Sequence, residues 1–181
     1  MNVKKLIILD IDETLIHATQ KPFEREHDFE TEWYFVYKRP YVHKFIEFCI
    51  EHFKVAVWTT VGHEFAEKVV SELFPRDFKL EFLWSYKRCT PTFNPELYET
   101  IYLKNLNKVK RLGYKLEHVI MVDDTPAKLA KNYGNLVRVN EYRGQEHDIE
   151  LKRLMKYLLY LKEFENVRKV EKRGWQSKFQ A

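Results

Sequence analysis

Two aspartates separated by one residue are the first candidates for a chemical role in this sequence. Asp10 and Asp12, with Thr14 after them, follow directly on the apolar run at residues 6–9. Carboxylates this close repel each other, and the end of a strand leaves them little room to separate. A hard cation such as Mg²⁺ is the usual way to neutralise them. The pattern therefore favours a metal-dependent site, although acidic turns without such a role are also common after strands.

Two other predicted strands also end in polar side chains. These are Thr59 and Thr60 after the strand at residues 55–58, and Asp123 and Asp124 after the strand at residues 119–122. In an open parallel sheet, the carboxyl ends of the strands form the binding crevice. We therefore expect these side chains to converge with the first aspartates at one edge of the sheet, an arrangement that chance does not readily produce.

Short apolar runs alternate with amphipathic segments of helical period along the chain. Strands are predicted at residues 6–9, 55–58, 80–84, 119–122 and 136–139, and helices at residues 42–53, 62–73, 103–112 and 148–164. Unbroken apolar runs are typical of strands buried on both faces. The alternation predicts an α/β, Rossmann-like domain with a parallel sheet of about five strands and helices on both faces.

The segment at residues 19–38 interrupts this alternation. Its second half is aromatic and β-branched, which predicts a small β-hairpin beside the site. Trp33, Tyr34, Phe35 and Tyr37 alternate, so some should face the core and others solvent. Exposed aromatic side chains beside a site favour partner binding. The alternative is that all four pack the hairpin against the domain. Residues 88–95, with two prolines, are predicted to be a loop.

The bulk properties predict one domain at residues 1–165 and a basic tail at residues 166–181. A net charge of +4 suits an anionic substrate without requiring nucleic acid. Two cysteines far apart are expected as buried thiols of a reducing compartment. No apolar run reaches membrane-spanning length and no signal peptide is recognisable, so we expect a cytoplasmic monomer without membrane contact. No G-x-G-x-x-G or Walker A pattern is present, which argues against a dinucleotide or P-loop site.

The segment DIDETL, followed by Ile16 and His17, resembles the DxDxT signature of the haloacid dehalogenase (HAD) superfamily. This form is similar to the branch that dephosphorylates the C-terminal domain (CTD) of RNA polymerase II, also called NLI-interacting-factor-like phosphatases. Further segments match the branch in order: VAVWT with Thr59, YLKNL with Lys104, and IMVDDTP with Asp123. The resemblance covers residues 6–139. It implies the HAD core without a large cap domain.

The resemblance implies a role for each matched residue. Asp10 would be the nucleophile that forms an aspartyl-phosphate, and Asp12 the general acid and base. Mg²⁺ would be held by Asp10, Asp123 and the backbone carbonyl of Asp12. Phosphoryl oxygens would be held by Thr59, Lys104 and the backbone N–H of Ile11.

Several of these assignments have rivals in the sequence itself. Thr60 could replace Thr59, and Lys108 or Lys110 could replace Lys104. The branch commonly has Asn where this chain has Asp124, so Asp124 either joins the metal site or caps the helix that follows.

Neither gap between the motifs is long enough for a lid domain, so the site should admit a phosphate on a large partner. The resemblance therefore implies a Mg²⁺-dependent phosphatase that acts on phosphoserine or phosphothreonine of a protein. Phosphorylated nucleic-acid ends and a small phosphorylated metabolite are alternatives within the enzyme class, of which nucleic acid is not favoured. A non-catalytic binding or scaffold protein on the same fold is the alternative of a different class, and the presence of both Asp10 and Asp12 argues against it.

Overall fold

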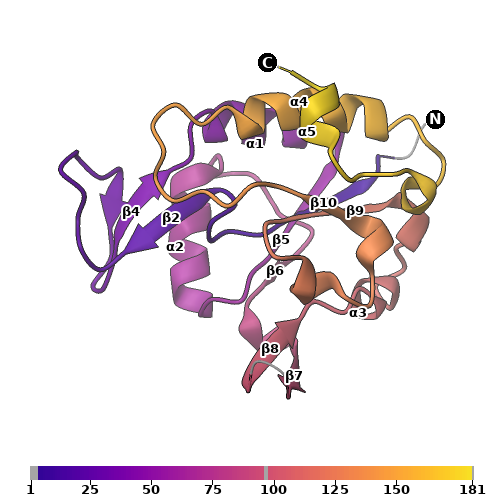
Figure 1. Cartoon of the computed structure of the whole chain (residues 1–181), viewed down its shortest axis with the longest axis horizontal. Coiled ribbons are helices and arrows are strands. Elements are labelled where there is room, and N and C mark those ends of the chain that lie inside the picture. The colour runs from indigo at the N-terminus through magenta and orange to yellow at the C-terminus, as the bar shows by residue number, and fades with distance from the viewer. Residues whose placement is uncertain (1–3, 96–97, 181) are drawn as a thin grey trace.

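The computed structural model describes residues 4–95 and 98–180. Its centre is a five-stranded sheet with the order β10-β9-β1-β5-β6, in which all neighbours are parallel (Figure 1). The strands are β1 (Leu6–Leu9), β5 (Lys54–Trp58), β6 (Leu83–Trp84), β9 (Val119–Asp123) and β10 (Leu136–Arg138). The predicted parallel sheet is confirmed, and the apolar β1 lies at its middle.

Helices cover both faces of the sheet, as predicted. The longer helices α1 (Val42–His52), α2 (His63–Leu73) and α4 (Glu150–Leu161) pack on one face. The other face is covered by α3 (Asn107–Lys110), η2 (Leu116–His118) and η3 (Pro126–Leu129). Alternate side chains of β1 enter the two cores, Ile7 on the first face and Ile8 on the second. This double burial explains why the strand is an unbroken apolar run.

Two antiparallel insertions extend from the core, at the left and the bottom of Figure 1. The first is a three-stranded sheet rather than a simple hairpin, and the second is a two-stranded hairpin. Their strands are β2 (Ile16–Thr19), β3 (Phe29–Glu30) and β4 (Phe35–Lys38), and β7 (Thr90–Asn94) and β8 (Glu99–Leu103). Among the described residues no larger domain is inserted, which agrees with the expected lack of a cap.

The second insertion corrects two predictions. The segment predicted as a loop at residues 88–95 begins with the last residue of η1 (Tyr86–Arg88) and contains strand β7. The helix predicted at residues 103–112 is reduced to α3, and the first residue of the predicted helix, Leu103, is instead the last residue of β8, which pairs with β7. Threonine and aromatic side chains favour this pairing, and a two-stranded hairpin has free edges at which Pro91 is tolerated. The strand predicted at residues 80–84 is shortened to β6.

The basic tail folds back onto the domain through η5 (Val167–Lys169) and α5 (Trp175–Lys178). Trp175 is buried, stacks on Tyr157 of α4, and donates its indole N–H to the Arg138 carbonyl at 2.7 Å. This contact covers part of the free edge of β10, which is preceded by η4 (Tyr133–Asn135). Cys49 and Cys89 are buried free thiols. In the part of the chain described, no helix has the length and apolar character needed to span a membrane.

Candidate active site

The polar strand ends meet at the carboxyl edge of the sheet. Leu9 of β1 lies level with Val57 of β5 and Val122 of β9. Asp10 therefore leaves β1 beside the end of β9, and its N–H donates to the Val122 carbonyl at 3.0 Å. Asp10 and Asp123 are both fully buried. The register of three strands thus brings together carboxylates that are far apart in the sequence.

A tight turn after β1 orients the side chains of the DxDxT motif. The N–H groups of Thr14 and Leu15 donate to the Ile11 carbonyl at 3.2 and 2.8 Å. Glu13 has φ of 57°, a left-handed conformation that is uncommon outside glycine. Its carboxylate accepts a hydrogen bond from the His17 ring at 2.9 Å, which holds the turn to β2. Strained backbone of this kind is often found at functional sites.

Lys104 lies between the two buried aspartates. Its Nζ lies 2.9 Å from Asp10 Oδ2 and 2.6 Å from Asp123 Oδ2, and its side chain is fully buried. Lys108, a rival candidate from the sequence, instead donates to the Arg88 carbonyl at 2.7 Å. The structure therefore places Lys104 at the site, just after β8 and next to the carboxylates.

Lys128 is a second lysine at the site, and none of the matched sequence motifs includes it. Its Nζ donates to Asp10 Oδ2 at 2.8 Å and lies 3.6 Å from Asp123 Oδ1. Burial opposes the charged ammonium, but Asp10 and Asp123 outweigh this and raise the pKa of Lys128. The available signal was its position four residues after Asp124, the spacing at which opposite charges meet on a helical turn.

Three carboxylates could hold a metal ion. Oxygens of Asp10, Asp123 and Asp124 lie within 4.8 Å of one another. Asp124 Oδ1 is buried and accepts no hydrogen bond, while Oδ2 accepts one from the Thr125 hydroxyl at 2.9 Å. A buried orphan carboxylate oxygen in an all-oxygen cluster fits a hard cation such as Mg²⁺. The side chain of Asp12 is outside this trio, so only its backbone carbonyl is a candidate metal ligand.

The buried carboxyl groups differ in proton affinity. Burial, followed by the charge of Asp10, raises the pKa of both Asp12 and Asp123 to about 7. For Asp10 burial acts in the same direction, but the two lysines together outweigh it and hold its pKa far below the usual range. The site thus separates an ionised carboxylate from a neighbouring carboxyl group that can carry a proton near neutral pH, as acid–base catalysis requires.

The remaining predicted phosphate contacts lie on the same edge. Thr59 follows β5 and is fully buried, and its N–H donates to the Trp84 carbonyl at 2.8 Å. Thr60 is partly exposed. The Ile11 N–H donates to Asp10 Oδ1 at 2.8 Å, so in this structure it orients the carboxylate of Asp10.

A groove of about 460 Å³ opens beside Asp12 and Glu13. Its other walls come from the first insertion and from the start of α2: Ala18, Tyr34, Val61, Gly62 and Phe65. Tyr34 meets Phe65 edge-on, with 5.8 Å between ring centroids. The groove therefore connects the Asp12 carboxyl group to aromatic side chains of the first insertion.

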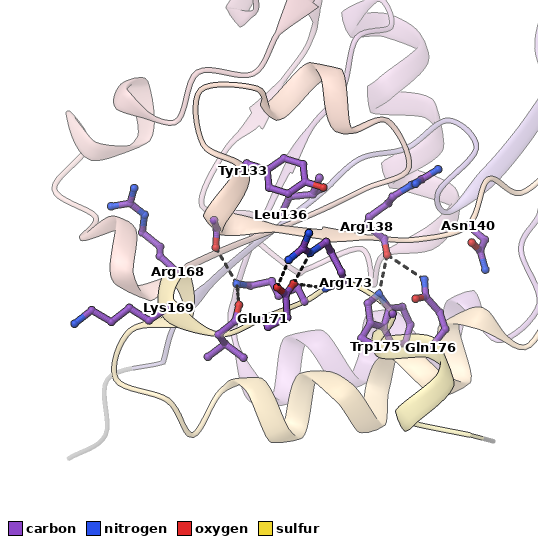
Figure 2. A pocket seen from close by; sticks show the side chains of 14 residues that line it. Tyr133, Leu136, Arg138, Asn140, Arg168, Lys169, Glu171, Arg173, Trp175 and Gln176 are labelled. Atoms are coloured by element: carbon purple, nitrogen blue, oxygen red, sulfur yellow. Dashed lines mark hydrogen bonds and ion pairs between the residues drawn. The ribbon is translucent and has the colours of Figure 1, made fainter.

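A larger pocket, of about 720 Å³, lies away from the carboxylate cluster, along β10 and the folded-back tail (Figure 2). Its one buried charged side chain, Lys172, donates to the carbonyls of Gly134, Val167 and Val170. Glu171 in this pocket is paired with Arg173 (Figure 2). Lys172 and Glu171 are thus occupied in contacts within the tail region, and the pocket contains none of the clustered carboxylates, so the smaller groove is the better candidate for substrate.

Comparison with known proteins shows that this chain is similar to a family of phosphatases. The family model of NLI interacting factor-like phosphatases matches residues 5–168. A CTD small phosphatase-like protein 1 of Caenorhabditis elegans is 30% identical over 171 residues, which cover 91% of this chain and 33% of the relative. A human CTD small phosphatase-like protein is 28% identical, over 82% of this chain and 52% of the relative. The chain thus spans about a third to a half of these two curated relatives.

Solved structures share the fold. The RNA polymerase II CTD phosphatase Fcp1 superimposes with a TM-score of 0.69 at 16% identity, over 88% of this chain and 62% of that one. A phosphatase domain of Bacteroides fragilis complexed with Mg has a TM-score of 0.51 at 15% identity, over 92% and 42%. The resemblance to the HAD superfamily and its CTD-phosphatase branch is confirmed. This chain belongs to the NLI interacting factor-like phosphatase family.

Proposed function

We propose that this protein is a Mg²⁺-dependent phosphatase that hydrolyses phosphate monoesters through an aspartyl-phosphate on Asp10. The observation that carries the proposal is the contrast between two neighbouring carboxyl groups. Asp10 is held ionised by Lys104 and Lys128, whereas burial and Asp10 raise the pKa of Asp12 to about 7. A nucleophile and a proton donor two residues apart are what a two-step phosphoryl transfer needs.

In the first step, an oxygen of Asp10 attacks phosphorus and the bond from phosphorus to the leaving oxygen breaks. Asp12 gives its proton to that oxygen, so that a neutral alcohol departs. In the second step Asp12 takes a proton from water as the water attacks the phosphorus, which releases phosphate and restores the Asp10 carboxylate. Lys104, 2.9 Å from Asp10, is placed to stabilise charge on the phosphoryl oxygens, with Thr59 and the Ile11 N–H as further donors.

The carboxylates of Asp10, Asp123 and Asp124, with the Asp12 carbonyl, would hold Mg²⁺. When bound, the metal would supply positive charge that lets an anionic phosphate approach these carboxylates.

A phosphorylated protein is the proposed substrate, with phosphoserine or phosphothreonine as the target. Trp33 is 68% exposed and Tyr34 37% exposed on the first insertion, and Tyr34 also lines the groove beside Asp12. An open groove with aromatic walls suits a polypeptide that extends beyond the phosphate. The names of the relatives also include CTD phosphatases. A monomeric state and a cytoplasmic location stay predictions.

The test is turnover of an aryl phosphate, a phosphopeptide panel and 5′-phosphorylated oligonucleotides, each with and without Mg²⁺. We expect activity that requires Mg²⁺, is highest on phosphopeptides, and is abolished in Asp10→Asn. Acid-quenched enzyme should carry phosphate on Asp10. Full activity of monodisperse Asp10→Asn would refute the nucleophile, and preference for oligonucleotides or for small metabolites would refute the protein substrate. Absence of any turnover would favour a binding protein.

A matched pair of variants tests the groove. Tyr34→Ala should raise KM for a phosphopeptide and leave turnover of a small aryl phosphate nearly unchanged, because remote contacts act only on a substrate that reaches them. Tyr133, 53% exposed and outside the groove, gives the control variant Tyr133→Ala. Parallel losses on both substrates in Tyr34→Ala would show that this side chain has a packing role.

A further inference from the structure

The ammonium group of Lys128 lies among the carboxylates that could hold a metal. Its Nζ is 2.8 Å from Asp10 Oδ2, 3.6 Å from Asp123 Oδ1 and 3.7 Å from Asp124 Oδ1. These are the same three residues whose oxygens lie within 4.8 Å of one another. A monovalent cation supplied by the chain itself therefore contacts every carboxylate of the candidate metal cluster.

The two lysines of the site have different surroundings. Lys104 is fully buried and contacts the Oδ2 atoms of Asp10 and Asp123. Lys128 retains 16% exposure of its side chain and faces Oδ1 of Asp123 and of Asp124. Its contact with Asp124 is too long for a hydrogen bond, which leaves that oxygen an orphan. Lys128 is thus the more loosely held cation and has a path towards solvent.

The backbone of Lys128 is anchored, but its side chain can move. The Lys128 carbonyl accepts the Lys104 N–H at 2.7 Å, and the next residue, Leu129, is fully buried in the second core. Because a lysine side chain is a flexible four-carbon stem, its ammonium can withdraw without displacing this backbone. The fold therefore fixes the start of the side chain and leaves the position of its charge adjustable.

A divalent ion and this ammonium compete for the same carboxylates. Mg²⁺ contacts its oxygen ligands at about 2.1 Å and demands near-octahedral geometry around itself. The Lys128 ammonium lies 2.8 to 3.7 Å from an oxygen of each of the three carboxylates that such an ion would use, and two cations held by the same small cluster repel strongly.

We propose that Lys128 is an internal counter-ion that competes with Mg²⁺ for the three carboxylates and has to withdraw before Mg²⁺ binds. The inference deepens the proposed function, since it concerns the same cluster, but it requires metal binding only and no turnover. It has two consequences. The cluster is neutralised enough to stay folded without metal, and the affinity for Mg²⁺ is lowered by the contacts that the ammonium must give up.

The test compares Mg²⁺ binding by calorimetry in the wild type, Lys128→Met and the control Lys131→Met, an exposed lysine three residues along the chain. In Lys128→Met no charge-assisted hydrogen bond has to be broken before Mg²⁺ binds, so we expect Mg²⁺ binding to be about 10- to 100-fold tighter than in the wild type. Its melting temperature in EDTA should be lower than that of the wild type, and its rise on adding Mg²⁺ larger. Lys131→Met should match the wild type in both measurements.

Unchanged or weaker Mg²⁺ binding in Lys128→Met would overturn the inference, as would the absence of Mg²⁺ binding in both proteins. A measurement on the wild type covers the case in which Lys128→Met does not fold. The ¹⁵N resonance of the Lys128 ammonium, assigned with Lys128→Arg, should shift on saturation with Mg²⁺, and an unchanged resonance would overturn the inference. A protein that binds Mg²⁺ but hydrolyses no phosphate monoester would refute the proposed function and leave this inference standing.

Discussion

Arg39 links the loop that carries the DxDxT motif to the start of α4. Its Nε and Nη2 donate to the two carboxylate oxygens of Asp148 at 2.9 and 2.8 Å, and its Nη1 donates to the Thr14 carbonyl at 3.1 Å. The Arg39 side chain is 0% exposed and that of Asp148 14% exposed. Asp148 also accepts the Glu150 N–H at the beginning of α4. One guanidinium thus satisfies acceptors on two segments far apart in the chain.

Replacement of Arg39 by Met removes all three hydrogen bonds and leaves Asp148 without its counter-charge. Breaking a buried ion pair from one side costs about 3–5 kcal/mol. Because Asp148 is partly exposed and can recruit water, we expect a loss near the lower limit, about 3 kcal/mol. For a domain of this size that loss lowers the melting temperature by about 6–12 °C. Asp148→Asn should cost more, since it leaves the fully buried guanidinium without a counter-charge.

The assay is urea unfolding followed by tryptophan fluorescence, with Arg39→Met and Asp148→Leu arranged in a double-mutant cycle. Removal of both charges together should cost far less than the sum of the single losses, because neither charge is then left buried alone. Arg143→Met is the control, since Arg143 pairs with Glu141 on the surface and should matter little. A coupling energy near zero, or a loss in Arg39→Met no larger than in the control, would refute the reasoning.

Three further predictions concern the site and its rim. Asp12→Asn should lower turnover of an alkyl phosphate by about 10²–10⁴-fold and that of an aryl phosphate much less, because an aryl leaving group needs little protonation; equal losses would point to a structural role. Trp33→Ala should raise KM for a phosphopeptide without loss of stability, because Trp33 is 68% exposed, whereas Tyr37→Ala should lower the melting temperature, because Tyr37 is fully buried. A melting temperature that falls in Trp33→Ala and not in Tyr37→Ala would exclude a binding role for Trp33 and a packing role for Tyr37. Without metal, the free energy of unfolding should fall as the pH rises from about 4 to 7. The reason is that the raised pKa values of Asp12 and Asp123 make the folded chain bind more protons than the unfolded chain in this range. A free energy of unfolding that does not change with pH in urea titrations would contradict the raised pKa values.

Local sequence was sufficient to predict a strand or helix wherever the buried side of that element continues along its whole length. β1 at Leu6–Leu9 begins and ends where its apolar run does, because a central parallel strand is covered on both faces. The residue after such a strand must lie at the carboxyl edge of the sheet, which is why the apolar run was enough to place Asp10. The amphipathic helices α1 and α2 were predicted from the helical spacing of their apolar residues, because one side of each helix is buried along its length.

Local sequence was insufficient where strand pairing decides the structure. Strand β7 was predicted as a loop and strand β8 was not predicted, because strand preference depends on a partner strand that a local pattern does not include. The consequence reaches the site, since β8 ends at Leu103 and thereby sets the position of Lys104. The order of the motifs pointed to Lys104, but Lys108 and Lys110 are close to it in the chain, and only the contacts of the folded protein separate the three.

The sequence by itself determined which carboxylates reach the edge of the sheet and favoured Lys104 among its neighbours, whereas only the tertiary structure showed that Lys128 also meets these carboxylates. The contact between Lys128 and Asp10 joins residues 118 apart in the chain, and the pair of Arg39 and Asp148 joins residues 109 apart. Rules of helical or strand spacing describe neighbours within one element and contain no information about such pairs. A long, flexible cationic side chain finds its partner only after the elements have packed, because packing sets both the distance to the carboxylate and the burial that makes the contact strong.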